Sequence, residues 1–324
     1  KLDVIRERLA SHWGVDGEEV ALTRNASEGL HICQNAMDLV AGDEVVTSTM
    51  DYPRMINAWK QREQRDGIVL KQVKIPVPCE SAAEFLKAFA AAMTPRTKVL
   101  HICHVINLNG QILPVRELCD MAHRHGAKVI VDGAHGLAHF PFKISELGCD
   151  FYATSLHKWL AAPIGTGLLW MRREHIRSTW PLMAGAPEQV NDIRKFEEIG
   201  TNPVALKLGI EPALDLHQRI GDERKAARLR FLRDRWINAT ADISGFSLRT
   251  SLDPRWSCGF ATLDLAGITP GTVFSRLLNQ YRILVAPINH SETMGIRVSP
   301  SVYTTTAEID RFCDALKQIA RDER

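Results

Sequence analysis

Lys158 lies in the segment Ser155-Leu156-His157-Lys158-Trp159, directly after an apolar run at Asp150–Thr154 that predicts a strand. Open α/β sheets bind ligands beyond the carboxyl ends of their strands, so this lysine is well placed for chemistry. A lysine amine that is partly withdrawn from water becomes nucleophilic, and Ser155 and His157 add hydrogen-bond donors beside it. The segment alone is equally consistent with a surface lysine that happens to follow a serine and a histidine.

A carboxylate follows the preceding predicted strand, in Val131-Asp132-Gly133-Ala134-His135. Because that strand (Lys128–Asp132) and the next one end at the same edge of the sheet, we expect Asp132 to lie near Lys158. A carboxylate in this position could keep a ring nitrogen protonated, so that the ring withdraws electrons. An aspartate that caps a helix or closes a turn is the structural alternative.

The third segment, Thr23-Arg24-Asn25-Ala26-Ser27-Glu28-Gly29, lies between a predicted strand and an amphipathic helix. The free N–H groups and the positive dipole end of a helix N-terminus bind phosphate well, and Ser27 adds a hydroxyl. Alone, the segment is also explained by helix capping through Asn25 or Ser27. An amine, a carboxylate and a phosphate seat at one sheet edge together predict the cofactor pyridoxal 5'-phosphate (PLP).

The elements that must position these segments are typical of an α/β fold. Short apolar runs alternate with helical patterns at Glu28–Val40, Ser81–Met93 and Val115–His125, which end at a glycine or before a proline. Such apolar strands predict a sheet covered on both faces by helices. The predicted strands are Glu19–Leu22, Glu44–Ser48, Val69–Ile75, Lys98–Cys103, Lys128–Asp132, Asp150–Thr154 and Gly167–Met171.

The pattern changes near Asn202, where a long helical stretch begins at Val204 and continues to about Ile237, with a break at Gly221. Strands are then predicted at Gly259–Leu265, Arg282–Pro287 and Ile296–Val298, and helices at Thr272–Tyr281 and Thr306–Arg321. We therefore expect a large cofactor-binding domain over residues 15–202 and a smaller α+β domain over residues 203–324. Residues 1–14 are expected to form a helix that packs near the smaller domain.

Composition excludes several classes of function. The 324 residues carry 40 Lys+Arg and 38 Asp+Glu, a net charge of only +2, which argues against nucleic acid and anionic membranes as partners. No apolar stretch is long enough to span a bilayer. The seven cysteines are odd in number and no two have C-x-x-C spacing, so we expect buried, reduced thiols and a cytoplasmic location. The chain begins at Lys1 inside a helical pattern, and we expect it to be a fragment that could have lost a targeting segment.

Together, TRNASEGL, the DGAH turn and SLHKWLAAPIGTGLLWMRRE resemble the class V aminotransferase superfamily of fold-type I PLP enzymes, and most of all its isopenicillin N epimerase-like branch. The resemblance extends from about Val15 to Arg297. It implies a large domain with a mixed, mostly parallel sheet sandwiched by helices, and a smaller α+β C-terminal domain. It also implies an amino-acid substrate and a homodimer with a shared active site.

The resemblance assigns roles to individual residues. Lys158 matches the lysine that forms the Schiff base, Asp132 the partner of the pyridine nitrogen, and His135 a residue that hydrogen-bonds the phenolic oxygen of the ring. Tyr52, in TMDYPRM, matches the residue stacked on the ring. The matching phosphate ligands are the backbone of Ala26 and the side chains of Ser27, Ser155 and His157.

Three further positions bear on the substrate and the assembly. Asn107, in HVINLNG, matches a residue near the phenolic oxygen and the substrate, although Asn109 is close enough to confuse the register. Thr201 resembles a residue whose hydroxyl reaches the phosphate of a partner subunit. Arg297, in GIRVSP, matches the arginine that grips the substrate carboxylate, for which its planar fork is suited.

Each of these positions also has a purely structural explanation. Tyr52 could be a core or interface tyrosine, and Asn107 a turn asparagine. Thr201 could cap a helix before Pro203, and Arg297 could be an ordinary surface arginine on a strand.

The resemblance implies a reaction through an external aldimine and an α-carbanion, with epimerisation as the expected outcome. Class V aminotransferase or C–S lyase chemistry, and a non-catalytic PLP-fold binding protein, are the alternatives. Cysteine desulfurases carry a nucleophilic cysteine shortly before the carboxylate-binding arginine, whereas the stretch PINHSETMGIR has none. They also usually stack a histidine on the ring where this chain has Tyr52.

A zinc site is a weaker interpretation. The pairs His101 with His104 and His123 with His125 lack further ligands at metal-site spacing, so no metal site is predicted. Gly165-Thr166-Gly167 does not match a dinucleotide-binding loop and is interpreted as a close turn near Lys158.

Overall fold

The computed structural model describes residues 1–323, which form two compact units. The first unit comprises Lys1–Ile75, Ser81–Val105 and Leu113–Ile220. The second comprises Pro76–Glu80, Ile106–Ile112 and the chain from Gly221 onward. The predicted domain boundary between residues 202 and 203 stays a prediction.

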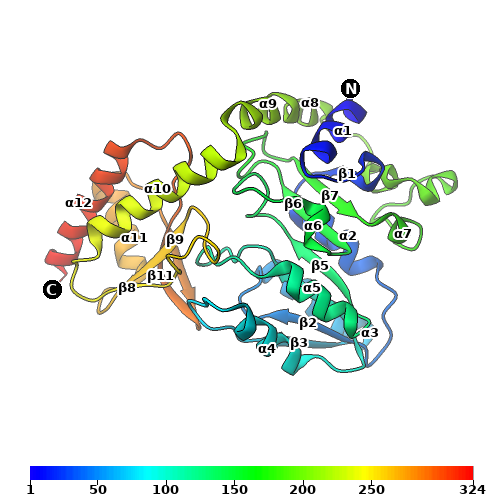
Figure 1. Cartoon of the computed structure of the whole chain (residues 1–324), viewed down its shortest axis with the longest axis horizontal. Coiled ribbons are helices and arrows are strands. Elements are labelled where there is room, and N and C mark those ends of the chain that lie inside the picture. The colour runs from blue at the N-terminus through cyan, green and yellow to red at the C-terminus, as the bar shows by residue number, and fades with distance from the viewer. Residues whose placement is uncertain (324) are drawn as a thin grey trace. The chain divides into compact units, whose positions relative to one another are not determined.

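A seven-stranded sheet forms the centre of the first unit, in the order β1-β7-β6-β5-β4-β2-β3 (Figure 1). Strands β2 to β6 are parallel to one another, and β7 runs antiparallel to both β6 and β1. The mixed, mostly parallel sheet that the sequence predicted is therefore confirmed. Its strands are β1 (Val20–Thr23), β2 (Glu44–Ser48), β3 (Val69–Val73), β4 (Thr97–Cys103), β5 (Lys128–Asp132), β6 (Phe151–Ser155) and β7 (Gly167–Met171).

Both faces of this sheet are covered, since all residues of β2 and β6, and all of β5 except the half-buried Lys128, are buried. Helices α2 and α3 pack on one face, where Leu30 and Trp59 join Ile130 in a single core cluster. Helix α5 contacts β4 and β5 and buries an apolar face of its own that includes Leu118. The helices of the unit are α1 (Leu2–His12), α2 (Ala26–Ala36), α3 (Pro53–Asp66), α4 (Ala82–Ala92), α5 (Val115–Arg124), α6 (Ile144–Leu147), α7 (Arg173–Ile176), α8 (Val204–Leu208) and α9 (Ile210–Ile220), with short 3-10 turns η1 (Gly17–Glu19), η2 (Pro187–Asn191) and η3 (Ile193–Glu197).

The second unit is a four-stranded antiparallel sheet packed against helices, as expected for a smaller α+β unit. Trp236 and Phe312 meet edge to face in its core. Its strands are β8 (Phe246–Leu248), β9 (Ala261–Leu265), β10 (Ala286–His290) and β11 (Thr293–Val298), and its helices are α10 (Asp222–Thr240), α11 (Pro270–Tyr281) and α12 (Thr306–Asp322).

Several predicted elements differ from the structure. Residues 282–285 of the predicted strand Arg282–Pro287 are not a strand, because Arg282 has a left-handed backbone (φ 57°) that ends α11. The long helix expected from Val204 is also broken at Gly209, which leaves α8 and α9 as separate helices. Helix α3 and strand β8 had no counterpart in the prediction.

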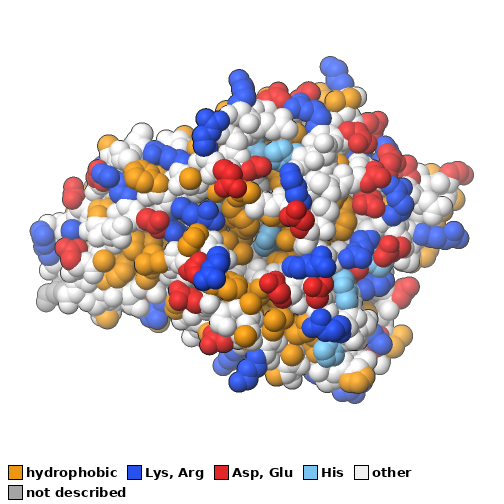
Figure 2. All heavy atoms as spheres, viewed as in Figure 1, with side chains coloured by type: hydrophobic (Ala, Val, Ile, Leu, Met, Phe, Trp, Pro, Cys, Tyr) orange, Lys and Arg blue, Asp and Glu red, His pale blue; other side chains and the backbone are white. Residues whose placement is uncertain are grey.

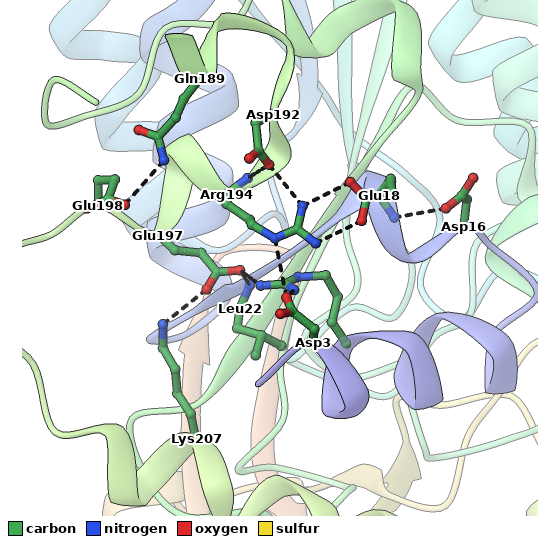
Figure 3. A network of polar contacts seen from close by, with 11 residues as sticks. Asp3, Asp16, Glu18, Leu22, Gln189, Asp192, Arg194, Glu197, Glu198 and Lys207 are labelled. Carbon is green, nitrogen blue, oxygen red and sulfur yellow. Dashed lines mark hydrogen bonds and ion pairs between the residues drawn. The ribbon is translucent and has the colours of Figure 1, made fainter. Parts of the chain in front are cut away.

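A network of charged side chains holds the segment around η3 in the first unit (Figure 3). The Nη atoms of Arg194 donate to the carboxylate of Glu18 at 2.8 and 2.9 Å. The Glu197 carboxylate accepts from Arg6 at 2.7 Å and from the backbone N–H of Leu22 at 2.9 Å. Strand β1, helix α1 and the chain that leads towards Thr201 are thereby joined.

The surface mixes charges of both signs (Figure 2), and the cysteines are buried. On the face shown in Figure 2, basic and acidic side chains are interspersed, without a large area of one sign. Within residues 1–323 no helix combines the length and the apolar character needed to cross a membrane. All seven cysteines are buried and none forms a disulfide, as predicted.

Candidate active site

The strand order brings the three chemistry-bearing segments to one edge of the sheet. Strands β5 and β6 are parallel neighbours, so Asp132 and the turn after Ser155 leave the sheet side by side. Gly167, at the start of antiparallel β7, pairs with Ser155 on one side and with Thr23 of β1 on the other. Since β1 leads directly into α2, the N-terminus of this helix lies beside the Lys158 segment.

Lys158 lies in the turn that follows β6, and its side chain is exposed. Its Nζ is 3.1 Å from Nε2 of His135, which comes from the turn after β5. The backbone carbonyl of Lys158 accepts from the N–H of Ala161, a non-glycine residue in the left-handed region (φ 62°). The Asp132–His135 segment and the Lys158 segment therefore meet at one edge of the sheet, as expected.

Asp132 is a buried carboxyl group, only 5% exposed. Its pKa is raised to about 6, mainly by burial and to a smaller extent by nearby Asp51, although the charge of Lys158 and a 2.9 Å bond from the Ala134 N–H lower it. A cationic N–H group placed against this carboxylate would offset its desolvation, which a protonated pyridine nitrogen does.

The N-terminus of α2 packs closely against the start of β7 and against Ser155. Asn25 caps it by accepting from the Glu28 N–H at 2.9 Å, and the Ala26 N–H donates to Ser155 Oγ at 3.0 Å. A Cβ atom on Gly167 would lie 2.6 Å from Cα of Asn25, so only glycine allows β7 to pass here. Ser155 thus has a partner already, whereas the hydroxyl of half-buried Ser27 has none within residues 1–323.

His157 is half-buried in the same turn as Lys158. Its Nδ1 is 3.1 Å from the carbonyl oxygen of Thr166, which can only accept, so Nδ1 carries a hydrogen. Nε2 is consequently a donor only when the ring is protonated. A contact from His157 to a phosphate oxygen would therefore come from the imidazolium form.

Tyr52 follows β2 and begins α3, with 39% of its surface exposed. The preceding residue, Asp51, is buried and holds the turn: its carboxylate accepts from the Thr47 hydroxyl at 2.6 Å, the Ser48 N–H at 2.7 Å and the Cys103 N–H at 2.8 Å. The sequence interpretation missed Asp51. The sequence feature that could have identified it is an acidic residue shortly after a buried strand and directly before Tyr52.

Trp159 is another functional candidate that the sequence interpretation left without a role. Its indole Nε1 donates to Nδ1 of His135 at 3.3 Å, and its ring stacks on His139 with 3.7 Å between centroids. Its position next to Lys158 was the available signal.

Thr201 lies in an exposed stretch between η3 and α8. In the described part of the chain, Thr201 makes no hydrogen bond to the Lys158 turn. Its expected role towards a second copy stays a prediction.

Arg297 and Asn107 meet within the second unit. Arg297 lies on β11, and its Nη1 donates to the backbone carbonyl of Asn107. The guanidinium carbon is 5.3 Å from the centre of the Phe260 ring, and burial lowers the pKa of Arg297. Within residues 1–323, Arg297 has no acidic partner, and neither its Nε nor Oδ1 of Asn107 has a hydrogen-bond partner. A carboxylate ligand would satisfy this arginine.

Asn109, the competing asparagine, has a structural role. Its Nδ2 donates to the carbonyl of Arg249 at 3.0 Å, and its Oδ1 accepts from the Gln111 N–H at 3.1 Å.

Comparison with known proteins decides the family. The model of the family described as aminotransferase class-V matches residues 1–312. The chain belongs to the class V aminotransferase family. A relative in Streptomyces clavuligerus, isopenicillin N epimerase, is 33% identical over 96% of this chain and 82% of its own. A probable cysteine desulfurase of Mycolicibacterium paratuberculosis is 30% identical over 97% of this chain and 48% of its own.

The solved structures agree on the fold. A lysine-to-alanine mutant of C-DES, with glycine covalently linked to its PLP cofactor, superposes with a TM-score of 0.86 and 22% identity, over 97% of this chain and 84% of that one. The predicted fold and the epimerase-like resemblance are thus confirmed. Class V aminotransferases are PLP-dependent enzymes, so this chain is a member of an enzyme family that uses the predicted cofactor.

The residues of this class V protein fit PLP on structural grounds. The first unit offers a buried carboxyl with a raised pKa, an exposed amine 3.1 Å from an imidazole, and a helix N-terminus whose Ser27 hydroxyl has no hydrogen-bond partner within residues 1–323. These are the groups that the ring nitrogen, the aldehyde carbon and the phosphate require. The role of each residue remains a prediction.

The four histidines of the two candidate zinc pairs have other partners. His101 accepts from the Trp59 indole, His104 bonds the Tyr152 hydroxyl, His123 pairs with Asp150, and His125 bonds the Met121 carbonyl. In the described chain, none of the four joins a group of three or more possible metal ligands.

Proposed function

We propose that this class V enzyme binds PLP through Lys158 and removes the α-hydrogen of an amino acid, with epimerisation at the α-carbon as the outcome. The observation that carries the proposal is the meeting of the Lys158 amine, His135 and the buried Asp132 carboxyl at the sheet edge beside the N-terminus of α2. When bound, PLP supplies an aldehyde carbon that condenses with amines and a ring that withdraws electrons from the substrate's α-carbon.

Each residue has a defined task in this proposal. Lys158 would hold the cofactor and, when its amine is free, would accept the α-hydrogen as a general base. Asp132 stays ionised against the ring nitrogen and keeps that nitrogen protonated. His135 and Asn107 bind the phenolic oxygen, and Tyr52 holds the ring flat.

The remaining tasks are binding. The backbone of Ala26 and the side chains of Ser27 and His157 bind the phosphate, and Ser155 holds the Ala26 N–H in place. Arg297 binds the α-carboxylate, because it is largely withdrawn from water and has no acidic partner among residues 1–323. The class of substrate is therefore an α-amino acid.

The epimerase outcome rests on the relative in Streptomyces clavuligerus and on features that disfavour desulfurase chemistry. Strand β10 ends at His290 and β11 begins at Thr293, so only two residues connect them, and neither is a cysteine. Burial raises the pKa of Cys258 to about 12, and it raises that of Cys103 above the ordinary range. Such thiols are poor nucleophiles.

The test is hydrogen exchange at the α-carbon. PLP-loaded protein is incubated in deuterated water with a panel of L-amino acids, and the α-deuterium content and the handedness of the recovered amino acid are measured. We expect deuterium to enter together with the D-form of at least one substrate. Formation of a keto acid would indicate transamination, and release of a sulfur leaving group would indicate C–S lyase activity; either would overturn the epimerase proposal.

Two variants make this test specific. Lys158→Ala is expected to abolish exchange, whereas Lys128→Ala, at the opposite end of β5, is expected to leave it intact. Exchange that persists in Lys158→Ala would contradict the role of Lys158. Binding of PLP without exchange of any amino acid would favour a non-catalytic PLP-fold binding protein.

A further inference from the structure

The hydrogen bond between Trp159 and His135 restricts where His135 can carry its proton. An indole N–H is a donor only, and Nε1 of Trp159 is 3.3 Å from Nδ1 of His135. Nδ1 must therefore offer its lone pair. A neutral imidazole has one hydrogen, which in this arrangement is on Nε2.

The nitrogen that carries this hydrogen faces the amine of Lys158. Nε2 of His135 is 3.1 Å from Nζ of Lys158. An ammonium group has no lone pair, so only the unprotonated amine can accept from Nε2–H. The unprotonated amine is also the form that attacks carbonyl carbons and accepts protons.

We propose that Trp159 is a positioning residue, which fixes the proton of His135 on Nε2 and so presents a hydrogen-bond donor to the Lys158 amine or to an acceptor oxygen that takes its place. The proposal rests on the proposed function, since it deepens the roles of His135 and Lys158. It explains why a tryptophan adjoins the lysine: a phenylalanine would fill the space but could not donate.

Neighbouring groups hold Trp159 in this orientation. The His139 ring, 1% exposed, stacks on the indole with 28° between the ring planes. Nδ1 of His139 donates to the backbone carbonyl of His135 at 2.9 Å, so the stacking partner is itself fixed to the turn that carries His135. The indole is thus held between two points of one turn.

Asp132 acts against the effect of Trp159. Its carboxyl interacts electrostatically with Lys158, and a carboxylate favours the ammonium form of the lysine. If Asp132 pairs with the ring nitrogen of the cofactor, its attraction for the Lys158 ammonium weakens. The N–H donor on His135 then favours the unprotonated amine. The protonation state of the Lys158 amine then depends on the hydrogen bond from Trp159 to His135.

The direct test is nitrogen NMR of the full chain labelled with ¹⁵N-histidine and ¹⁵N-tryptophan, without cofactor, at about pH 8, where an ordinary histidine is neutral. We expect the resonance of His135 Nε2 in the protonated range, that of Nδ1 in the unprotonated range, and a through-hydrogen-bond coupling between Nδ1 and the indole nitrogen of Trp159. This measurement uses the unaltered protein. A proton on Nδ1, or no coupling to Trp159, would overturn the proposal.

A substitution gives the second test. In Trp159→Phe, which keeps an aromatic ring against His139, the share of His135 with its proton on Nδ1 should rise about fivefold, the effect of losing one neutral hydrogen bond. The rate at which PLP condenses with the Lys158 amine, followed by absorbance, should fall by a similar factor. Trp180→Phe, at a tryptophan that is 72% exposed, is the matched control and should change neither. An unchanged proton distribution in a folded Trp159→Phe would refute the inference.

The two proposals fail in different ways. A protein with the proton on Nε2 and the coupling to Trp159, but without any binding of PLP, would contradict the proposed function and support the positioning by Trp159. A protein that binds PLP on Lys158 with the proton of His135 on Nδ1 would contradict the positioning alone.

Discussion

Asp132 is the residue whose charge state is most sensitive to the cofactor. In the protein without cofactor its folded pKa of about 6 is higher than the ordinary 3.8, mainly because it is buried. A carboxyl whose folded pKa is raised favours folding when protonated, so the free energy of unfolding falls as pH rises from about 4 to 6 and stays low above that. The loss is up to ~3 kcal/mol for a shift of about two pH units.

Asp132→Asn should therefore stabilise the cofactor-free protein above pH 6 and weaken PLP binding. The amide removes the ionisation cost and still accepts from the Ala134 N–H, but it cannot pair with a ring cation, so the Kd for PLP should rise about 10- to 100-fold. Thermal unfolding at pH 5 and 8 and absorbance titration with PLP measure both effects. An Asp132→Asn protein that is less stable at pH 8 and binds PLP normally would contradict this account of Asp132.

Arg297 is expected to act on substrate affinity. Because charge-assisted hydrogen bonds contribute about 1.5–3 kcal/mol, Arg297→Gln should raise KM about 10- to 100-fold, with a smaller effect on kcat. Steady-state kinetics on the identified amino acid provides the measurement. Arg255→Gln, at an exposed arginine of the same unit, serves as the control, and equal KM values for the two variants would remove Arg297 from the substrate site.

At the scale of elements, the approach of β7 to the start of α2 decides whether the phosphate seat forms. A Cβ on Gly167 would collide with the Asn25 backbone, so Gly167→Ala should displace the first turn of α2 and cost about 1–3 kcal/mol of stability. We also expect the Kd for PLP to rise at least about tenfold.

The matched variant is Gly271→Ala in α11, where the nearest atom, Thr269 Oγ1, is 3.9 Å from the added Cβ. It should leave PLP binding unchanged and keep or slightly raise stability, since alanine suits a helix better. Melting temperatures and PLP titrations of both variants test the idea. Equal melting temperatures and equal PLP affinities of the two variants would show that close packing at Gly167 does not shape the phosphate-binding site.

The sequence predicted the central sheet better than the rest of the fold, for a physical reason. Strands buried on both faces are rich in consecutive apolar residues, and β2, β5 and β7 match their predicted bounds residue for residue. Strand β10, with Pro287, Asn289 and His290, has no such pattern. The break at Gly209 was missed because its neighbours keep helical spacing.

The candidate site was predictable to a similar extent. The order of segments along the chain placed Asp132, His135 and Lys158 at one edge, because the ends of parallel strands meet there. Contacts that depend on side-chain orientation were not predictable, such as those of Asp51 with three donors and of Trp159 with His135. Spacing along the chain contains no information about these directions.

At the scale of the whole molecule, we propose a homodimer in which Thr201 of one copy reaches the phosphate of the other. Ile164, near the Lys158 turn, is 85% exposed, and Val204, shortly after Thr201, is 47% exposed. Gly165 lies against the Leu206 side chain, so these apolar groups come from adjoining segments of the first unit. Exposed apolar groups of this kind mark candidate interfaces.

Ile164→Lys should therefore weaken the dimer at least about tenfold, because it would bury a charge in an apolar contact. Sedimentation or light scattering over a range of concentrations gives the dissociation constant, and PLP affinity should fall with it. Val40→Lys, at another exposed apolar residue, is the control. A wild-type chain that stays monomeric at high concentration would contradict the dimer.

The central claim is that Lys158 carries PLP, and reduction with borohydride followed by peptide mapping tests it most directly. The protein is loaded with PLP, its visible absorbance is recorded, and it is then reduced and digested for mass spectrometry. We predict a visible band that disappears on reduction and a single phosphopyridoxyl group on the peptide that contains Lys158. Absence of the band, or a modification spread over other lysines with Lys158 unmodified, would contradict the account.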